Sequence, residues 1–166
     1  MKFQLQKRFR EDTEFYERDP IEKYVDYLRE KGRILEMGNL LFDTQAMTQP
    51  FVCHTRQCIP DSARNGSRRN GLSPDWQKPS ACLMFPLFLL ETNDEKGTIL
   101  VASHSPEVTA LGEADDGGHT AVGCLKKNPY ACGPLYVEMK NTLIAMFGQK
   151  AWDLLDRALR ERNACP

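Results

Sequence analysis

Residues 34–43 read ILEMGNLLFD, and this stretch carries the clearest indication of the fold. Two short apolar runs, Ile34–Met37 and Leu40–Asp43, flank the pair Gly38-Asn39. A two-residue Gly-Asn connection between strand-like runs is typical of a tight β-hairpin, because these residue types tolerate the positive φ angles that such turns need. The stretch therefore predicts two antiparallel strands joined by a short turn.

A second pair of strand-like runs follows later in the chain. Leu87–Thr92 and Thr98–Ser103 are separated by the charged segment Asn93–Gly97, which ends in glycine. Apolar runs on either side of a polar connection of this length predict a second hairpin with a longer turn.

Helical patterns flank the two hairpins. Asp19-Pro20 is a typical helix start and Gly32 a typical stop, so the sequence predicts a helix over about residues 20–31. Towards the other end, Pro134 opens a run with apolar residues at helical spacing, and Gly148 closes it. A last short helix is expected after Gly148, marked by Ala151, Trp152, Leu155, Ala158 and Leu159.

These elements predict an α+β fold. We expect one small domain over residues 19–163, with two β-hairpins, helices at both ends and cysteine-bearing loops around a metal site. Residues 1–18 are charged and only weakly periodic, which predicts an N-terminal arm or helix. The turn-rich residues 60–79 predict a surface loop.

Composition excludes several classes of protein. The chain has 166 residues, 41% of them hydrophobic, which suffices for a core without disulfide support. The formal net charge of −1 gives no global reason to expect nucleic acid or an anionic membrane as partner. Pro86 interrupts the longest apolar run, so no run reaches the about 18 residues of a membrane helix. The first residues lack the apolar core of a signal peptide, and we expect a cytoplasmic protein.

Six cysteines carry the strongest chemical signal. In a reducing compartment disulfides are rare, so spaced cysteines favour metal binding or catalysis over disulfide bonds. Cys53 and Cys58 form a CxxxxC pair, and Cys82 and Cys124 follow. Four thiolates suffice for a closed zinc site or for an iron–sulfur cluster. We expect zinc first and iron second.

Three further residues are candidate ligands, and two cysteines have other possible roles. His54 and His119 are further candidate ligands, since imidazole also binds zinc and iron, and Cys132 is another. Cys165 is expected to take no part. The alternative for Cys82, inside an apolar run, is an ordinary buried thiol.

The cysteines lie in motifs that resemble a known family. EMGNLLFD (36–43), FVCHTRQC (51–58) and KPSACLMFP (78–86) are together similar to the YkgJ-like cysteine-cluster proteins, which are described as zinc- or iron-chelating domains. Lys78–Pro86 matches the family's K/R-P-x-x-C-x-x-(F/Y)-P element in full. Cys124 and the segment Leu143–Gly148 also match its later part. The resemblance covers roughly residues 34–157 and implies a metal site.

This chain departs from the family at one point. Such proteins usually carry adjacent cysteines soon after the first pair, where this chain has Ile59–Ala63. What remains suits one metal ion, or one small cluster with mixed ligands.

A basic loop precedes Cys82. Arg64, Arg68, Arg69 and Lys78 outnumber the acidic residues near them and would suit a phosphate or carboxylate partner. A solvated loop is the more frequent meaning of such a run.

Three functions therefore remain open: a metal-binding protein of undefined pathway, an iron- or zinc-dependent enzyme completed by His119 or Asp116, and a zinc-stabilised module that binds nucleic acid or peptide. No catalytic residue and no protein partner is predicted, and nucleic acid is the less favoured partner.

Overall fold

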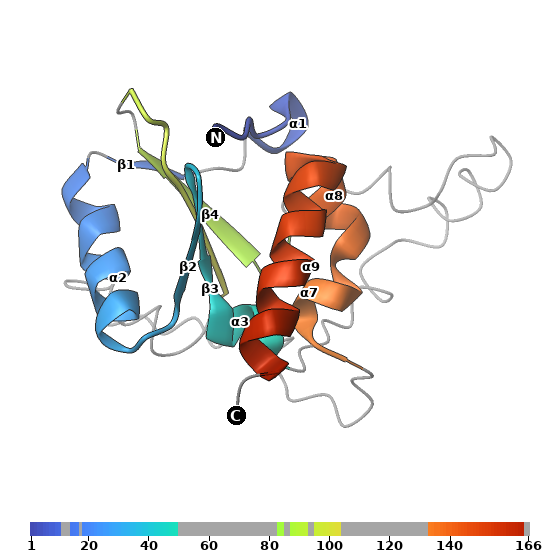
Figure 1. Cartoon of the computed structure of the whole chain (residues 1–166). Helices are drawn as coiled ribbons and strands as arrows, with labels where there is room; N and C mark the ends of the chain where they lie inside the picture. Colours follow the sequence, from blue (N-terminus) through green and yellow to red (C-terminus); the bar gives the residue numbers. More distant parts are fainter. Residues whose placement is uncertain are drawn as a thin grey trace, which may run out of the picture.

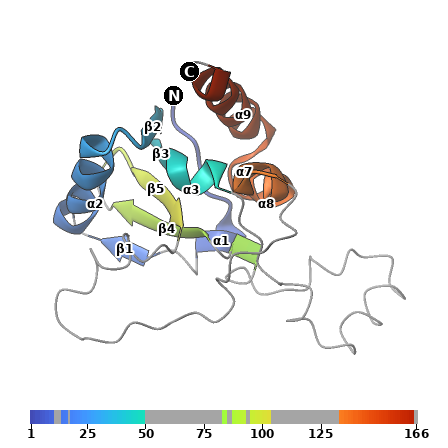
Figure 2. The same cartoon turned by 90° about the horizontal axis from the view of Figure 1, so that it is seen from below.

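The structure is a computed structural model that describes residues 1–10, 14–16, 18–49, 83–84, 87–92, 95–103 and 133–164. Its elements are, in chain order, α1 (Lys7–Arg10), β1 (Glu14–Tyr16), α2 (Arg18–Glu30), β2 (Ile34–Met37), β3 (Leu40–Asp43), α3 (Thr44–Thr48), β4 (Leu87–Thr92), β5 (Ile99–Ser103), α7 (Leu135–Glu138), α8 (Lys140–Phe147) and α9 (Gln149–Ala164). A mixed sheet lies between α2 on one face and α7, α8 and α9 on the other (Figures 1 and 2). The predicted α+β class is confirmed.

Within the described ranges the sheet has five strands, in the order β1-β4-β5-β3-β2. Both predicted hairpins are present: β2 pairs antiparallel with β3, and β4 pairs antiparallel with β5. The strand expected from Thr98 begins one residue later. The hairpins are joined by a parallel pairing of β3 with β5, in which Leu41 lies opposite Leu100. This pairing merges two local hairpins into one sheet.

The core has two layers because side chains alternate across the strands. Ile99 and Val101 of β5 belong to the cluster that also contains α7, α8 and α9, whereas Leu100 and Ala102 pack with α2. Helix α2 presents Ile21, Val25 and Leu28 to that face, at the spacing of an amphipathic helix. The helix expected from about residue 20 begins at Arg18.

The C-terminal helices differ from the expected pair. The single helix predicted between Pro134 and Gly148 is broken at Met139, which separates α7 from α8. The apolar residues that suggested one helix are all buried, namely Leu135, Met139, Leu143 and Met146. Their spacing is regular across the break, so the sequence pattern did not indicate it. Helix α9 has 16 residues and is longer than the short helix predicted.

Residues 1–10, called the N-terminal arm below, pack against the sheet and α8. Phe3, Leu5 and Phe9 are buried in the same cluster as the C-terminal helices. The backbone N–H of Gln6 donates to the carbonyl oxygen of Met146 at 3.0 Å. The arm thus contributes apolar side chains to the core, although most of its other residues are polar and exposed.

Gly38→Ala is expected to destabilise the protein more than Gly32→Ala. Both glycines have positive φ angles, +64° and +62°, at which a Cβ costs about 1–2 kcal/mol. A Cβ at position 38 would also overlap the carbonyl oxygen of Met1, whereas a Cβ at position 32 meets no atom within 4 Å. Chemical denaturation of both variants separates the two effects. Equal losses of stability would contradict the packing of Met1 on the β2–β3 turn.

Candidate functional site

The residues singled out from the sequence lie outside the described part of the chain. They are the metal ligands Cys53, Cys58, Cys82 and Cys124, the additional ligands His54, His119 and Cys132, and the basic residues Arg64, Arg68, Arg69 and Lys78. Their roles stay predictions. The structure describes the residues that flank the segments that carry them.

The ends of these segments converge at one edge of the sheet. Residues 50–82 follow Gln49 and precede Leu83, and residues 104–132 follow Ser103 and precede Gly133. Because β3 and β5 run parallel, their carboxyl ends share an edge, and β4 starts there with Leu87 opposite Ser103. We call this the α3 edge, since α3 directly follows β3.

A hydrogen bond and a buried side chain connect the flanking residues further. The backbone N–H of Leu135, the first residue of α7, donates to the carbonyl oxygen of Gln49 at 2.9 Å. The start of α7 therefore lies beside the end of α3, at the lower end of the sheet in Figure 1. Met84, two residues after Cys82, is 3% exposed and belongs to the core. Residues 104–132 thus begin and end at this edge, and residues 50–82 begin there and end with four residues between Cys82 and Leu87, the first residue of β4.

A buried ion pair anchors α3. Asp43 ends β3, and its carboxylate accepts hydrogen bonds from Arg33 Nη2 at 2.6 Å and Arg33 Nε at 3.1 Å. The same carboxylate caps α3 by accepting from the backbone N–H groups of Gln45 and Ala46. The two side chains are only 1% and 11% exposed, for Asp43 and Arg33 respectively. This arrangement fixes the direction in which the chain leaves β3.

Sequence reasoning missed α3 and this ion pair. No helix was predicted between the first hairpin and Cys53, although aspartate at the end of a strand is a favoured N-cap and could have indicated a helix start. Thr44 also ties the start of α3 to Arg33, because its backbone N–H and its hydroxyl both donate to the carbonyl oxygen of Arg33. No sequence signal connects Arg33 with Asp43, because the pairing depends on the register that sets Ile34 opposite Asp43.

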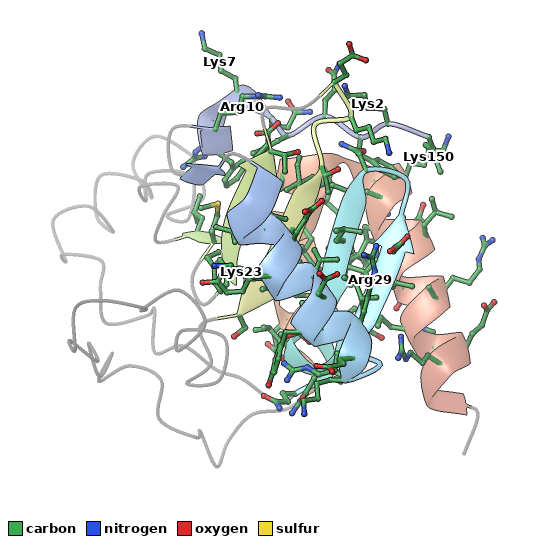
Figure 3. All side chains as sticks on the ribbon, turned by 90° about the vertical axis from the view of Figure 1, so that its left-hand side faces the viewer. Lys2, Lys7, Arg10, Lys23, Arg29 and Lys150 are labelled. Atoms are coloured by element: carbon green, nitrogen blue, oxygen red, sulfur yellow. The ribbon has the colours of Figure 1, made fainter. Side chains whose placement is uncertain are left out.

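A second buried carboxylate lies on β4. Glu91 is 6% exposed, and its Oε1 lies 3.6 Å from Arg10 Nη1 of the arm. Its Oε2 has no hydrogen-bond partner among the described residues. Lys2 and Glu91 Oε1 both lie beside Gly97, and Lys2 Nζ donates to the carbonyl oxygen of Glu95. Figure 3 shows Lys2 and Arg10 at the same end of the molecule.

Among the described residues, local structure raises the pKa of Tyr136, of Arg29 and of Arg160, the last chiefly because Asp156 accepts a hydrogen bond from its guanidinium. The pKa of Tyr136 is raised, chiefly because burial disfavours the phenolate and next because the Asp156 carboxylate is near. The pKa of Arg29 is raised because Glu36 accepts a hydrogen bond from its guanidinium.

The described residues contain no group of three histidine, cysteine, aspartate or glutamate side chains that could hold a metal ion. All cysteines and histidines of the chain lie outside this part. In the same part, no helix combines the length and the apolar character needed to cross a bilayer.

Comparison with known proteins adds no relative. No family model, no curated protein and no solved structure matches this chain. The likeness to the YkgJ-like cysteine-cluster proteins therefore stays a resemblance of motifs.

Proposed function

We propose that this chain is a cytoplasmic metal-binding protein whose ligands are Cys53, Cys58, Cys82 and Cys124. Zinc is the first choice of metal, and iron or an iron–sulfur cluster is the second. The observation that supports the proposal most is the α3 edge, where both cysteine-bearing segments start and where the second of them ends. The proposed site draws its ligands from two separate segments, and holding the ends of both segments at one edge shortens the loops that must close to bring these ligands together.

Chain length limits how far some of these cysteines lie from the α3 edge. Cys82 directly precedes Leu83, and Cys53 follows Gln49 by four residues, a reach of about 14 Å at full extension. Cys132 directly precedes Gly133, whereas Cys124 lies nine residues before Gly133 and has a reach of roughly 30 Å. This comparison supports Cys53 and Cys82 most strongly. It also keeps Cys132 as a candidate for the fourth position.

The surroundings of the α3 edge suit a structural metal. The Arg33–Asp43 pair and the hydrogen bond between Leu135 and Gln49 hold the bases of the segments in fixed positions. A metal bound by all four thiolates would cross-link residues 50–82 and 104–132 above this base. Metal binding would then contribute directly to the stability of the fold.

The test is the metal content of protein purified without a metal-binding tag. Elemental analysis is expected to find about one zinc per chain, and the visible spectrum is expected to be featureless because zinc has a filled d shell. Stoichiometric iron with visible absorption would support the second choice of metal and favour a redox or enzymatic role. Protein that is folded and free of metal, and that binds neither added zinc nor added iron, would contradict the proposal.

A further inference from the structure

We propose that the surface that holds the N-terminal arm is a recognition site for an extended, basic and apolar peptide of another protein. In this structure the chain's own arm occupies that site. The arm-binding surface comprises Gly38 and Asn39 of the β2–β3 turn, Glu91 of β4, Gly97 of the β4–β5 turn and Met146 of α8. The arm-binding surface lies at the opposite end of the sheet from the α3 edge, so it does not depend on the proposed metal site.

Asn39 binds the arm through its backbone. Its Oδ1 accepts from the N–H of Phe3 at 2.6 Å, and its Nδ2 donates to the carbonyl oxygen of Phe3 at 3.0 Å. The same Nδ2 donates to the carbonyl oxygen of Gly97 at 2.9 Å, which holds the amide in place. The amide of Asn39 thus makes the two hydrogen bonds that a residue of a neighbouring β-strand would make with the backbone of Phe3. It recognises an extended backbone whatever its side chains.

Residues 2–6 of the arm, which precede α1, have the side-chain pattern of a bound extended peptide. Phe3 and Leu5 are buried, whereas Lys2, Gln4 and Gln6 between and beside them are exposed. This alternation is what an extended chain shows when one side lies on a surface. A second backbone contact follows at Gln6, whose N–H donates to Met146. Gly38 allows the backbone of Met1 to approach closely, because no Cβ stands between them.

Glu91 is satisfied only in part by the arm. Arg10 Nη1 stays 3.6 Å from Oε1, beyond ordinary hydrogen-bond length, and the Arg10 side chain is 45% exposed. Oε2 has no partner in the described part of the chain. A guanidinium that donated to both carboxylate oxygens would bind this buried charge better than Arg10 does. The favoured partner peptide therefore carries an arginine that reaches both oxygens of Glu91 and competes with the arm for this surface.

The experiment uses the full chain and a fluorescent synthetic peptide of residues 1–10 as probe. The wild type is expected to bind it weakly, because the tethered arm competes at a millimolar effective concentration. The double variant Phe3→Ala, Leu5→Ala weakens the resident arm but leaves the surface intact. It is expected to bind the probe at least tenfold more tightly than the wild type, whereas the exposed-site control Gln4→Ala is expected to behave as wild type.

Two additions to the double variant test the named contacts. Asn39→Ala and Glu91→Gln are each expected to reverse the gain in affinity by at least tenfold. A probe with Arg10 replaced by alanine is expected to bind less tightly. If the double variant unfolds cooperatively and yet does not bind the probe, the arm is simply part of the core and the proposal is overturned.

Hydrogen exchange of the wild type provides a test that does not depend on the variants. The amides of Phe3 and Gln6 are expected to exchange at least tenfold faster than that of Val101 in the central strand, because the arm opens without global unfolding. Equal protection would overturn the proposal. A wild-type dimer with exchanged arms would assign the surface to a second copy of this chain, and so would also overturn it.

Discussion

Asp43→Ala is expected to lower the free energy of unfolding by about 3–5 kcal/mol, the range found when one partner of a buried ion pair is removed. The substitution leaves the Arg33 guanidinium buried without its carboxylate, and α3 loses the acceptor for the N–H groups of Gln45 and Ala46. A loss of this size is a large part of the stability of a typical domain. Urea denaturation followed by circular dichroism measures it.

The chain provides a matched control in the pair Arg29–Glu36. Its nitrogen–oxygen distance is 2.7 Å, close to the 2.6 Å of Arg33–Asp43, but both side chains are 53% exposed. Glu36→Ala is therefore expected to lower stability by about 0–1 kcal/mol, since water screens the pair. Similar losses for Asp43→Ala and Glu36→Ala would contradict the view that burial makes the Asp43 carboxylate essential.

Asp43→Asn separates the two roles of the side chain. The amide oxygen retains an acceptor for the helix cap but carries no charge to offset Arg33. We expect a loss of stability between those of Glu36→Ala and Asp43→Ala. A loss as large as that of alanine would assign the whole effect to the ion pair.

Cys53→Ser and Cys82→Ser are each expected to abolish stoichiometric metal binding and to lower stability markedly. Structural zinc in small peptides contributes apparent free energies of about 10–16 kcal/mol at neutral pH. This chain also has a packed core, so we expect a lower melting temperature and faster proteolysis of the cysteine-bearing segments rather than complete unfolding. Elemental analysis and thermal denaturation, with and without a chelator, measure the two effects.

Cys165→Ser is the matched control, because Cys165 is the cysteine expected to take no part. It should bind as much metal as the wild type and should lose stability on chelation to the same extent. If Cys53→Ser and Cys82→Ser bind as much metal as Cys165→Ser, these cysteines are not ligands.

Sequence reasoning predicted the local elements well. Both hairpins appear with nearly the expected bounds, because a period of two and a turn of suitable residues are properties of neighbouring residues. It failed where a pattern stayed regular while the backbone changed, as at Met139 between α7 and α8. It also missed α3, although Asp43 carried a helix-start signal.

The candidate metal site was predicted from residue types and from motifs alone. Spacing limited the ligand set but could not show that Gln49, Leu83, Ser103 and Gly133 lie near one edge, because that depends on how two hairpins combine. Glu91 gave no signal either. A glutamate in a strand-like run looks solvent-exposed until the arm is known to cover it.

The sequence by itself determined the hairpins, the main helices and the cysteine positions, since each depends on residues close together in the chain. Only the tertiary structure decided the parallel pairing of β3 with β5, the burial of Asp43 against Arg33 and the partial pairing of Glu91 with the arm. These features depend on which distant segments share a core. Which segments share a core is determined mainly by the burial of apolar surface, which involves the whole chain and has no preferred direction.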